Sequence, residues 1–292
     1  MQASFADIYT KTILTTMATV RKKRIYFARH GERIDWIDKN WMATGERPSD
    51  PSLSHYGLQQ ARELALYVAQ IQPRITHIYA SPFLRTIQTA LQVAHELNRH
   101  VSSADEIIKI RLEPGYGEYF FDEWDQSTIY RPSSQLFEAS QNIACIDQDY
   151  DSVIKSDYYL QTKIESRQQL RNRLKRVIES TLDSSKDDSN ILIVTHAAPL
   201  IEGARALATI TRERNQGMNN MEEIENQKNL ETNNLSKWEM LPIRAGVCSL
   251  TYFELIDDKW ILLENGLASY LSKGEQNVWI FPDDSSLYEP SE

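Results

Sequence analysis

Four short apolar runs alternate with longer amphipathic stretches over most of the chain. The runs are RIYFA from Arg24, ITHIYA from Ile75, IIKIR from Ile107 and ILIVT from Ile191. The first, second and fourth are almost continuously apolar, which is typical of strands that are buried on both faces of a sheet. We therefore predict that all four runs are strands of one central sheet.

The stretches between these runs repeat their apolar residues with helical spacing. In the helix predicted from His55, the apolar stripe consists of Leu58, Ala61, Leu64, Ala65, Val68 and Ile71. Ser54 can cap this helix, because its side-chain oxygen can accept from a backbone N–H of the first turn. Ser81 and the proline after it predict the start of a second helix, and similar stripes predict helices from Lys163 and after the last apolar run.

Alternating strands and helices with short connections predict an α/β fold with three layers, a mostly parallel central sheet covered by helices on both faces. Two later segments, AGVCSLTYFEL from Ala245 and KWILLENG from Lys259, predict a C-terminal β-hairpin that closes the sheet. Ligands of such sheets bind beyond the carboxyl ends of the strands. The segments ARHG, SPFLR, LEPGYGE and THAAP follow the four strands, so we expect them at one edge of the sheet.

The chain is predicted to form a single domain over residues 21–272, preceded by a flexible extension at residues 1–20. Residues 211–240 are rich in Asn, Gln and Glu and predict an exposed polar insertion. Residues 273–292 form an acidic, proline-containing tail that we expect to pack loosely.

Composition and charge narrow the classes of function. With 292 residues, 41% hydrophobic and 25% charged, the chain can bury a sizeable core. Its net charge of -9 argues against broad binding to nucleic acid or to an anionic membrane, both of which require a basic surface. It has no apolar run of the roughly 18 residues that a membrane span requires. Cys145 and Cys248 lie in no CxxC pattern, which favours free thiols in a reducing compartment, here the cytoplasm or nucleus.

The predicted edge of the sheet concentrates cationic and imidazole side chains. The candidates there are Arg29, His30, Gly31, Arg33, Arg85 and His196. Each is a weak signal alone, because an arginine or histidine at the end of an element is more often structural. Together they predict a pocket for a dianion, since guanidinium groups bind phosphate oxygens bidentately and keep their charge at physiological pH.

The same residues favour phosphoryl transfer. Its transition state spreads negative charge over the phosphoryl oxygens, which cationic side chains stabilise. A neutral imidazole can act as the nucleophile at physiological pH. The sequence has neither HCxxxxxR nor GxxxxGK[ST], and it shows no dense Asp/His set, so we predict no metal and no other cofactor.

The segments FARHGER, SPFLRTIQTA and IVTHAAPL, in this order, resemble the histidine phosphatase (phosphoglycerate mutase-like) superfamily over most of residues 24–265. RHGER, RLEPGYGEY and THAAPL resemble most the branch that contains the suppressor of T-cell receptor signalling proteins, the ecdysteroid-phosphate phosphatases and the phosphatase-like domain of the TFIIIC tau subunit. The C-terminal RAGVCSLTYFEL is most similar to the TFIIIC type. The resemblance implies a histidine phosphatase-like fold and a metal-independent phosphomonoesterase.

The resemblance also implies roles for individual residues. His30 would be the nucleophile that becomes a phosphohistidine, and His196 would assist catalysis. The expected phosphate-binding residues are Arg29, Arg33, Arg85, His196 and Gly31. Glu113 and Glu118 compete as the acid that protonates the leaving group; the match of GYGEY favours Glu118 and leaves Glu113 a structural role. Nearby aromatic residues could partly desolvate this acid and help it to hold its proton.

Two features differ from many members of the superfamily. Asp35 stands where many members carry Asn, and it could add negative charge to the pocket rim. Ala197 and Ala198 replace a glycine pair, as in the branch named above. Neither difference removes a proposed catalytic group.

The substrate and partners remain open at this level. The aromatic segment at residues 117–124 could line a pocket for an aryl or other bulky apolar leaving group, or it could pack a lid or the core. The expected substrate is a phosphomonoester of a small molecule or a phosphoprotein. One alternative is a phosphoglycerate mutase-type phosphotransferase. Another is a phosphatase-like module that associates with transcription-complex subunits, without direct contact to nucleic acid.

Overall fold

The computed structural model describes residues 22–45, 48–120, 145–155, 158, 164–216 and 241–284. The N-terminal extension predicted at residues 1–20 and the larger part of the polar insertion, residues 217–240, lie outside the described residues.

The centre of the fold is one six-stranded sheet in the order β3-β2-β4-β1-β5-β6. The strands are β1 (Arg24–Arg29), β2 (His77–Ala80), β3 (Ile110–Leu112), β4 (Asn190–Thr195), β5 (Leu250–Ile256) and β6 (Lys259–Leu267). The first four pair in parallel, whereas β5 runs antiparallel to both β1 and β6. The predicted α/β fold with a mostly parallel sheet and a C-terminal hairpin is therefore confirmed.

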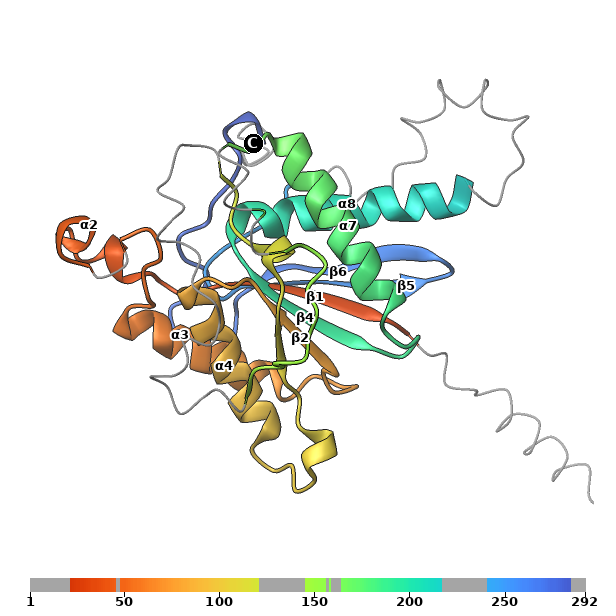
Figure 1. The fold of residues 1–292 in the computed structure, drawn as a ribbon, viewed down its shortest axis with the longest axis horizontal. Coiled ribbons are helices and arrows are strands. Elements are labelled where there is room, and N and C mark those ends of the chain that lie inside the picture. The colour runs from red at the N-terminus through yellow and green to blue at the C-terminus, as the bar shows by residue number, and fades with distance from the viewer. Residues whose placement is uncertain are drawn as a thin grey trace, which may run out of the picture.

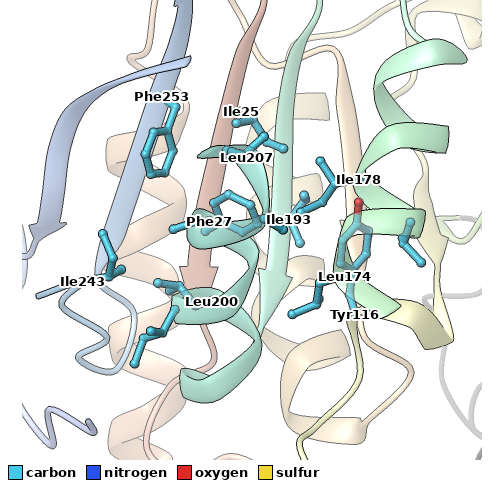
Figure 2. Packing of buried hydrophobic residues seen from close by; sticks show 14 of the residues in the cluster. Ile25, Phe27, Tyr116, Leu174, Ile178, Ile193, Leu200, Leu207, Ile243 and Phe253 are labelled. Atoms are coloured by element: carbon cyan, nitrogen blue, oxygen red, sulfur yellow. The ribbon is translucent and has the colours of Figure 1, made fainter. Parts of the chain in front are cut away.

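Helices cover both faces of this sheet (Figure 1). On one face lie α3 (His55–Val68) and α4 (Leu84–Asn98), and on the other lie α7 (Arg167–Asp183) and α8 (Ala197–Gln216). The alternation of side chains along β1 supplies both cores, because successive residues of a strand point to opposite faces. Tyr26 packs in the α3/α4 core, while Phe27 packs with Leu200 and Leu207 of α8 and with Ile193 of β4 (Figure 2).

Two element boundaries differ from the sequence prediction. The third strand begins at Ile110 and pairs with β2 there, whereas Ile107 follows a short helix, η2 (Ala104–Glu106), and is 41% exposed. The helix predicted from Lys163 begins at Arg167, because Ser166 and Gln169 form a reciprocal capping box.

Capping explains how the two helices nearest the sheet edge begin. Ser54 caps α3 as predicted, accepting from the backbone N–H of Gly57. Ser81 does not begin α4, which corrects the sequence prediction. The cap of α4 is Phe83, and the N–H of Leu84 donates to the carboxylate of Asp50. The Ser81 hydroxyl is directed instead to a histidine in the functional site.

The C-terminal segment at residues 273–284 packs firmly against the domain, so the expectation of a loose tail is wrong for these residues. Phe281 is buried in the core on the α7/α8 face. The carboxylate of Asp284 accepts hydrogen bonds from Arg167 at 2.7 Å and from Arg205 at 2.8 Å. None of the helices in the described part of the chain combines the length and apolar character needed to cross a bilayer.

Candidate active site

The two predicted site histidines meet because β1 and β4 are neighbours in the sheet. Arg29 pairs with Thr195 in parallel register, so the residues that follow, His30 and His196, leave the sheet side by side. Their ring centroids are 5.3 Å apart, and both side chains are buried. A cavity of about 240 Å³ opens at this edge. Its lining consists of Arg29, His30, Arg33, Trp36, Glu118, Tyr119, Ala197, Ala198 and Trp279.

The geometry of His30 fixes which ring nitrogen can react. Its Nδ1 lies 2.7 Å from the carbonyl oxygen of Gly31. A carbonyl oxygen only accepts, so Nδ1 carries the proton and Nε2 keeps its lone pair. Burial, with the charges of Arg85 and Arg29, holds the pKa of His30 well below its usual value. The imidazole is therefore neutral at physiological pH and can act as a nucleophile.

Gly31 has a steric role in this turn. A Cβ atom at Gly31 would lie only 2.5 Å from the carbonyl oxygen of Gly57, in the first turn of α3. Glycine at this position therefore lets the turn after β1 pack directly on the start of α3, which positions His30 against the helix layer.

Arg29 and Arg85 bring buried positive charge to the site. Arg29 Nη1 donates to the carbonyl oxygens of Ala245 at 2.7 Å and Asn277 at 2.6 Å. Arg85 Nη2 donates to the Glu118 carboxylate at 3.2 Å. Within the described part of the chain, Arg29 Nε and both Nε and Nη1 of Arg85 are buried without a hydrogen-bond partner. Arg85 Nη1 also lies 3.6 Å from Oδ1 of the buried Asp50, an ion pair longer than a hydrogen bond. The remaining guanidinium donors can serve an oxyanion bound at the site.

These two guanidinium groups keep their charge despite their burial. Desolvation lowers the pKa of Arg29 to about 10 and that of Arg85 to about 10. Both pKa values remain well above physiological pH. The site therefore holds two buried cations, and each is also close to the Glu118 carboxylate, whose charge opposes the lowering of the pKa.

Arg33 lines the cavity, but a neighbouring carboxylate shares its charge. Its Nε and Nη2 donate to the two carboxylate oxygens of Asp35, at 2.9 and 2.5 Å. The guanidinium also lies over the ring of Trp36, 5.4 Å from its centroid. Asp35 therefore acts directly on Arg33 in addition to placing negative charge at the pocket rim.

The structure separates the two candidate acids. Glu113 is completely buried. Its carboxylate accepts from the N–H groups of Gly115, Val153 and Ile154 and from the Tyr150 hydroxyl. Four donors hold this carboxylate within the fold, away from the lining of the cavity, and they give Glu113 a structural role.

Glu118 faces the cavity and contacts both a site arginine and a site histidine. Its Oε2 lies 3.2 Å from Arg85 Nη2 and 3.3 Å from His196 Nδ1, and its Oε1 accepts from the N–H of Tyr119 at 3.0 Å. The Glu118 side chain is 16% exposed, so its carboxylate can be reached by solvent or by a molecule bound in the cavity.

His196 is oriented by Ser81, whose Oγ lies 2.8 Å from Nε2 of the imidazole. Within the described residues, the buried Nδ1 of His196 has no hydrogen-bond partner, although the Glu118 carboxylate is 3.3 Å away. Burial, with the charge of Arg85 and the nearby His30, holds the pKa of His196 well below its usual value. A neutral His196 can donate one hydrogen bond from Nδ1 when Ser81 donates to Nε2.

The donor set of His30, Glu118 and His196 raises the question of a metal ion. One ligand atom from each residue lies within 4.8 Å of the others, and two imidazoles with a carboxylate can bind Zn²⁺. The positive charges of Arg29 and Arg85, which already act on both imidazoles, repel a divalent cation, whereas they attract an oxyanion. The arrangement therefore fits a tetrahedral oxyanion better than a metal ion.

Sequence reasoning missed several residues that build the site. Trp36 and Trp279 line the cavity, Ser81 orients His196, and Asn277 holds Arg29. Ser81 could have been identified as a site residue, since it follows β2 at the same edge as His30. The adjacent proline favoured its interpretation as a helix start instead. Trp279 lies in the C-terminal segment, where no motif marks it.

The aromatic segment at residues 117–124 contributes to the site only in part. Tyr119 lines the cavity. Phe120 is buried and packs with Phe83, away from the cavity lining. Residues 121–124 lie outside the described residues.

Comparison with known proteins identifies the family to which the chain belongs. The family model described as "Histidine phosphatase superfamily (branch 1)" matches residues 25–226, and the chain belongs to this superfamily. The chain is 29% identical to the transcription factor tau 55 kDa subunit of Saccharomyces cerevisiae, over 88% of this chain and 58% of that protein. It is 29% identical to the ecdysteroid-phosphate phosphatase of Drosophila melanogaster, over 64% of this chain and 27% of that protein.

A solved structure supports the same fold. The ecdysone phosphate phosphatase from Bombix mori, in complex with tungstate, matches with a TM-score of 0.59 at 21% identity, covering 84% of this chain and 93% of that chain. The resemblance to the histidine phosphatases is thus confirmed, and two of the matched relatives are named as phosphatases. The sequence matches cover only part of the length of either curated relative.

Proposed function

We propose that this chain is a metal-independent phosphomonoesterase that acts through a phosphohistidine on His30. The observation that carries the proposal is the cavity at the sheet edge, where a neutral imidazole lies among guanidinium groups with buried donors that lack a hydrogen bond. Such a site binds the phosphoryl group of an ester as a dianion and presents a nucleophile to it.

In the first step, Nε2 of His30 attacks phosphorus in line with the leaving oxygen. The N–P bond forms as the ester P–O bond breaks, and Glu118 transfers its proton to the departing oxygen. Glu118 lines the cavity beside Arg85 and His196, within reach of the leaving oxygen of an ester bound there. Arg29, Arg85 and His196 donate to the phosphoryl oxygens and stabilise the transition state.

In the second step, water releases the phosphate. Glu118, now a carboxylate, takes a proton from a water molecule as that water attacks phosphorus. The new P–O bond forms, the P–N bond breaks, and His30 returns to its neutral form with its lone pair on Nε2. The contacts of Glu118 to both Arg85 and His196 keep the carboxylate next to the phosphoryl group through both steps.

The nucleophile is tested with His30→Ala in an assay of 4-nitrophenyl phosphate hydrolysis. We expect kcat/KM to fall by at least about a thousandfold, because the other imidazole of the site, His196, has its Nε2 directed to Ser81 and cannot replace the lost nucleophile. A rapid base quench, in which the P–N bond is stable, should also trap a phosphohistidine in the unsubstituted protein and none in the variant. His100→Ala, at an exposed position after α4, serves as the matched control. Activity of His30→Ala within a few-fold of the unsubstituted protein would refute the assignment.

The walls of the cavity bear on the leaving group. Trp36, Tyr119 and Trp279 all line the cavity that holds His30. Aromatic rings stack on flat apolar groups, so we propose that the preferred leaving group is planar and apolar. A phosphoglycerate mutase-type transfer would instead require a polar acceptor, and formation of isomerised phosphoglycerate is the assay that detects it.

A second candidate function is an interaction module. The observation that favours it is the similarity to a transcription factor subunit over 88% of this chain. We propose on this ground a nuclear role beside transcription-complex subunits, which is compatible with phosphatase activity. Affinity purification of the full chain tests it: stoichiometric recovery of transcription factor subunits supports the role, and recovery of the chain alone opposes it.

A further inference from the structure

A buried arginine outside the cavity binds the backbone that carries Glu118. Arg173 of α7 is 4% exposed and belongs to none of the site motifs. Its Nη1 donates to the carbonyl oxygens of Gly115 at 2.8 Å and Gly117 at 3.1 Å. Its Nη2 donates to the carbonyl oxygen of Glu118 itself at 3.1 Å. One side chain therefore fixes three carbonyl groups within four consecutive residues.

Glu165 extends this arrangement to the other side of Glu118. Its carboxylate accepts from Nε of Arg173 at 2.9 Å and from Nη2 at 2.7 Å, and Tyr158 donates to the same carboxylate at 3.1 Å. The backbone N–H of Glu165 donates to the carbonyl oxygen of Phe120 at 2.7 Å. The segment that carries Glu118 is thus held before this residue by Arg173 and after it by Glu165.

The clamp formed by Arg173 and Glu165 is a buried ion pair, with 2% of the one side chain and none of the other exposed. Such a pair gains little net stability, because removing both charges from water costs about as much as their attraction returns. Its hydrogen bonds converge on the loop of Glu118, where η3 (Pro114–Tyr116) has ended and residues 117–120 form no regular element. This convergence indicates that the clamp controls the geometry of the loop.

In the proposed reaction, the rate depends strongly on the position of the general acid, Glu118. A general acid must lie within hydrogen-bond reach of the leaving oxygen, and an error of about 1 Å can cost roughly a hundredfold in rate. The nucleophile does not depend on this loop, because His30 is fixed by the end of β1 and by Gly31. Loosening the clamp should therefore impair proton donation more than nucleophilic attack.

We propose that Arg173, together with Glu165, is a positioning residue that holds the backbone of Glu118 for protonation of the leaving group. The proposal rests on the phosphomonoesterase function proposed above. It predicts a change in leaving-group dependence, since an ester with an acidic leaving group needs little protonation and one with a basic leaving group needs it fully.

The test compares kcat/KM of Arg173→Met for 4-nitrophenyl phosphate and phenyl phosphate. This parameter reports only the steps up to formation of the phosphohistidine, so the later role of Glu118 as a base does not enter. We expect a loss of at most about tenfold for the nitrophenyl ester and of about a hundredfold or more for the phenyl ester, because a general acid contributes roughly 100- to 10,000-fold. Glu118→Gln should show the same selectivity.

Arg171→Met is the matched control. Arg171 lies on the same helix and pairs with the buried carboxylate of Glu202, away from the Glu118 loop. Arg171→Met should change kcat/KM for both esters by the same factor. An equal loss for the two esters with Arg173→Met overturns the proposal while leaving the function intact. If His30→Ala kept the activity of the unsubstituted protein, the proposed function itself would be overturned.

If Arg173→Met fails to fold, Glu165→Gln provides the same test. This variant keeps Arg173 and its backbone contacts but removes the buried charge that orients the guanidinium. A smaller loss that is still selective for phenyl phosphate supports the proposal, and a loss that does not discriminate between the esters overturns it.

Discussion

At the scale of single residues, Asp35 controls how much of the Arg33 charge reaches the cavity. Both carboxylate oxygens of Asp35 accept from Arg33. An incoming oxyanion must compete with this carboxylate for the same guanidinium. We therefore expect Asp35→Asn to bind inorganic phosphate or tungstate about fivefold more tightly, which corresponds to about 1 kcal/mol for a partly exposed ion pair. Competitive inhibition constants measure the change.

The control for this prediction is Asp38→Asn, an exposed carboxylate that accepts from the Asn40 N–H. It should leave the inhibition constant unchanged. Weaker oxyanion binding by Asp35→Asn would mean that Asp35 acts chiefly to orient Arg33, and the competition argument would then be wrong.

Sequence alone can predict the residues that directly follow strands, and it cannot predict the residues that support them. His30 and His196 can be identified from the sequence because each follows an apolar run, at the edge where a parallel sheet binds its ligands. The role of Ser81 is hidden, because its partner His196 is distant in sequence and only the pairing of β2 with β4 brings them together. Arg173 gives no signal, since a polar residue on an amphipathic helix usually faces solvent.

At the scale of elements, the C-terminal segment completes the cavity. The carbonyl oxygen of Asn277 accepts from Arg29, and Trp279 lines the cavity. The guanidinium carbon of Arg167 lies 3.9 Å from the centroid of the Phe281 ring. The sequence predicts a loose tail here because the segment is polar and has no strand or helix pattern. Its order comes from contacts with elements far away in the chain, which local patterns do not encode.

Trp279 gives this segment a measurable role in recognition. We expect Trp279→Ala to weaken binding of phenylphosphonate about fivefold while leaving methylphosphonate unchanged, because an aromatic contact contributes about 1 kcal/mol. Inhibition constants for the two stable analogues provide the comparison. Val278→Ala, at an exposed neighbouring position, is the control. Equal effects on the two phosphonates would show that Trp279 supports the cavity without contacting the leaving group.

At the scale of the whole molecule, the order of the strands in the sheet brings the site residues together. Because β1 and β4 lie together at the centre, two histidines from segments 166 positions apart become neighbours, and β2 and β5 supply the flanking support. The layers can be predicted from the alternation of strands and helices. The strand order cannot, since it is decided by packing among all the elements at once.

The same burial that prepares the site makes the stability of the fold depend on pH. The pKa values of His30 and His196 are well below their usual values in the folded protein, mainly through desolvation. In the unfolded chain both groups titrate at about 6.5. Below that pH the unfolded state binds protons that the folded state does not, so stability falls on acidification and is fully present above about pH 6.5. Each histidine contributes a slope of up to about 1.4 kcal/mol per pH unit.

His77 provides a test of this linkage away from the cavity. It begins β2, and burial together with the charge of Arg111 lowers its pKa to about 4. It should therefore add to the same loss of stability between about pH 6.5 and pH 4. Urea unfolding at about pH 7.5, 6.5 and 5.5 measures the slope, in a buffer without phosphate because a bound oxyanion would stabilise the folded state.

Two variants separate the contributions of individual histidines to the pH dependence of stability. His77→Gln should flatten the pH dependence below about pH 6.5 while leaving kcat/KM at neutral pH close to that of the unsubstituted protein. His196→Gln should flatten it further and also reduce activity, because His196 resists protonation and, in the proposed mechanism, donates to the phosphoryl group. If stability were constant over this pH range in the unsubstituted protein, the buried histidines would have to accept protons in place. His30 would then be protonated below about pH 6.5, and the neutral nucleophile of the proposed chemistry would be lost over that acidic range.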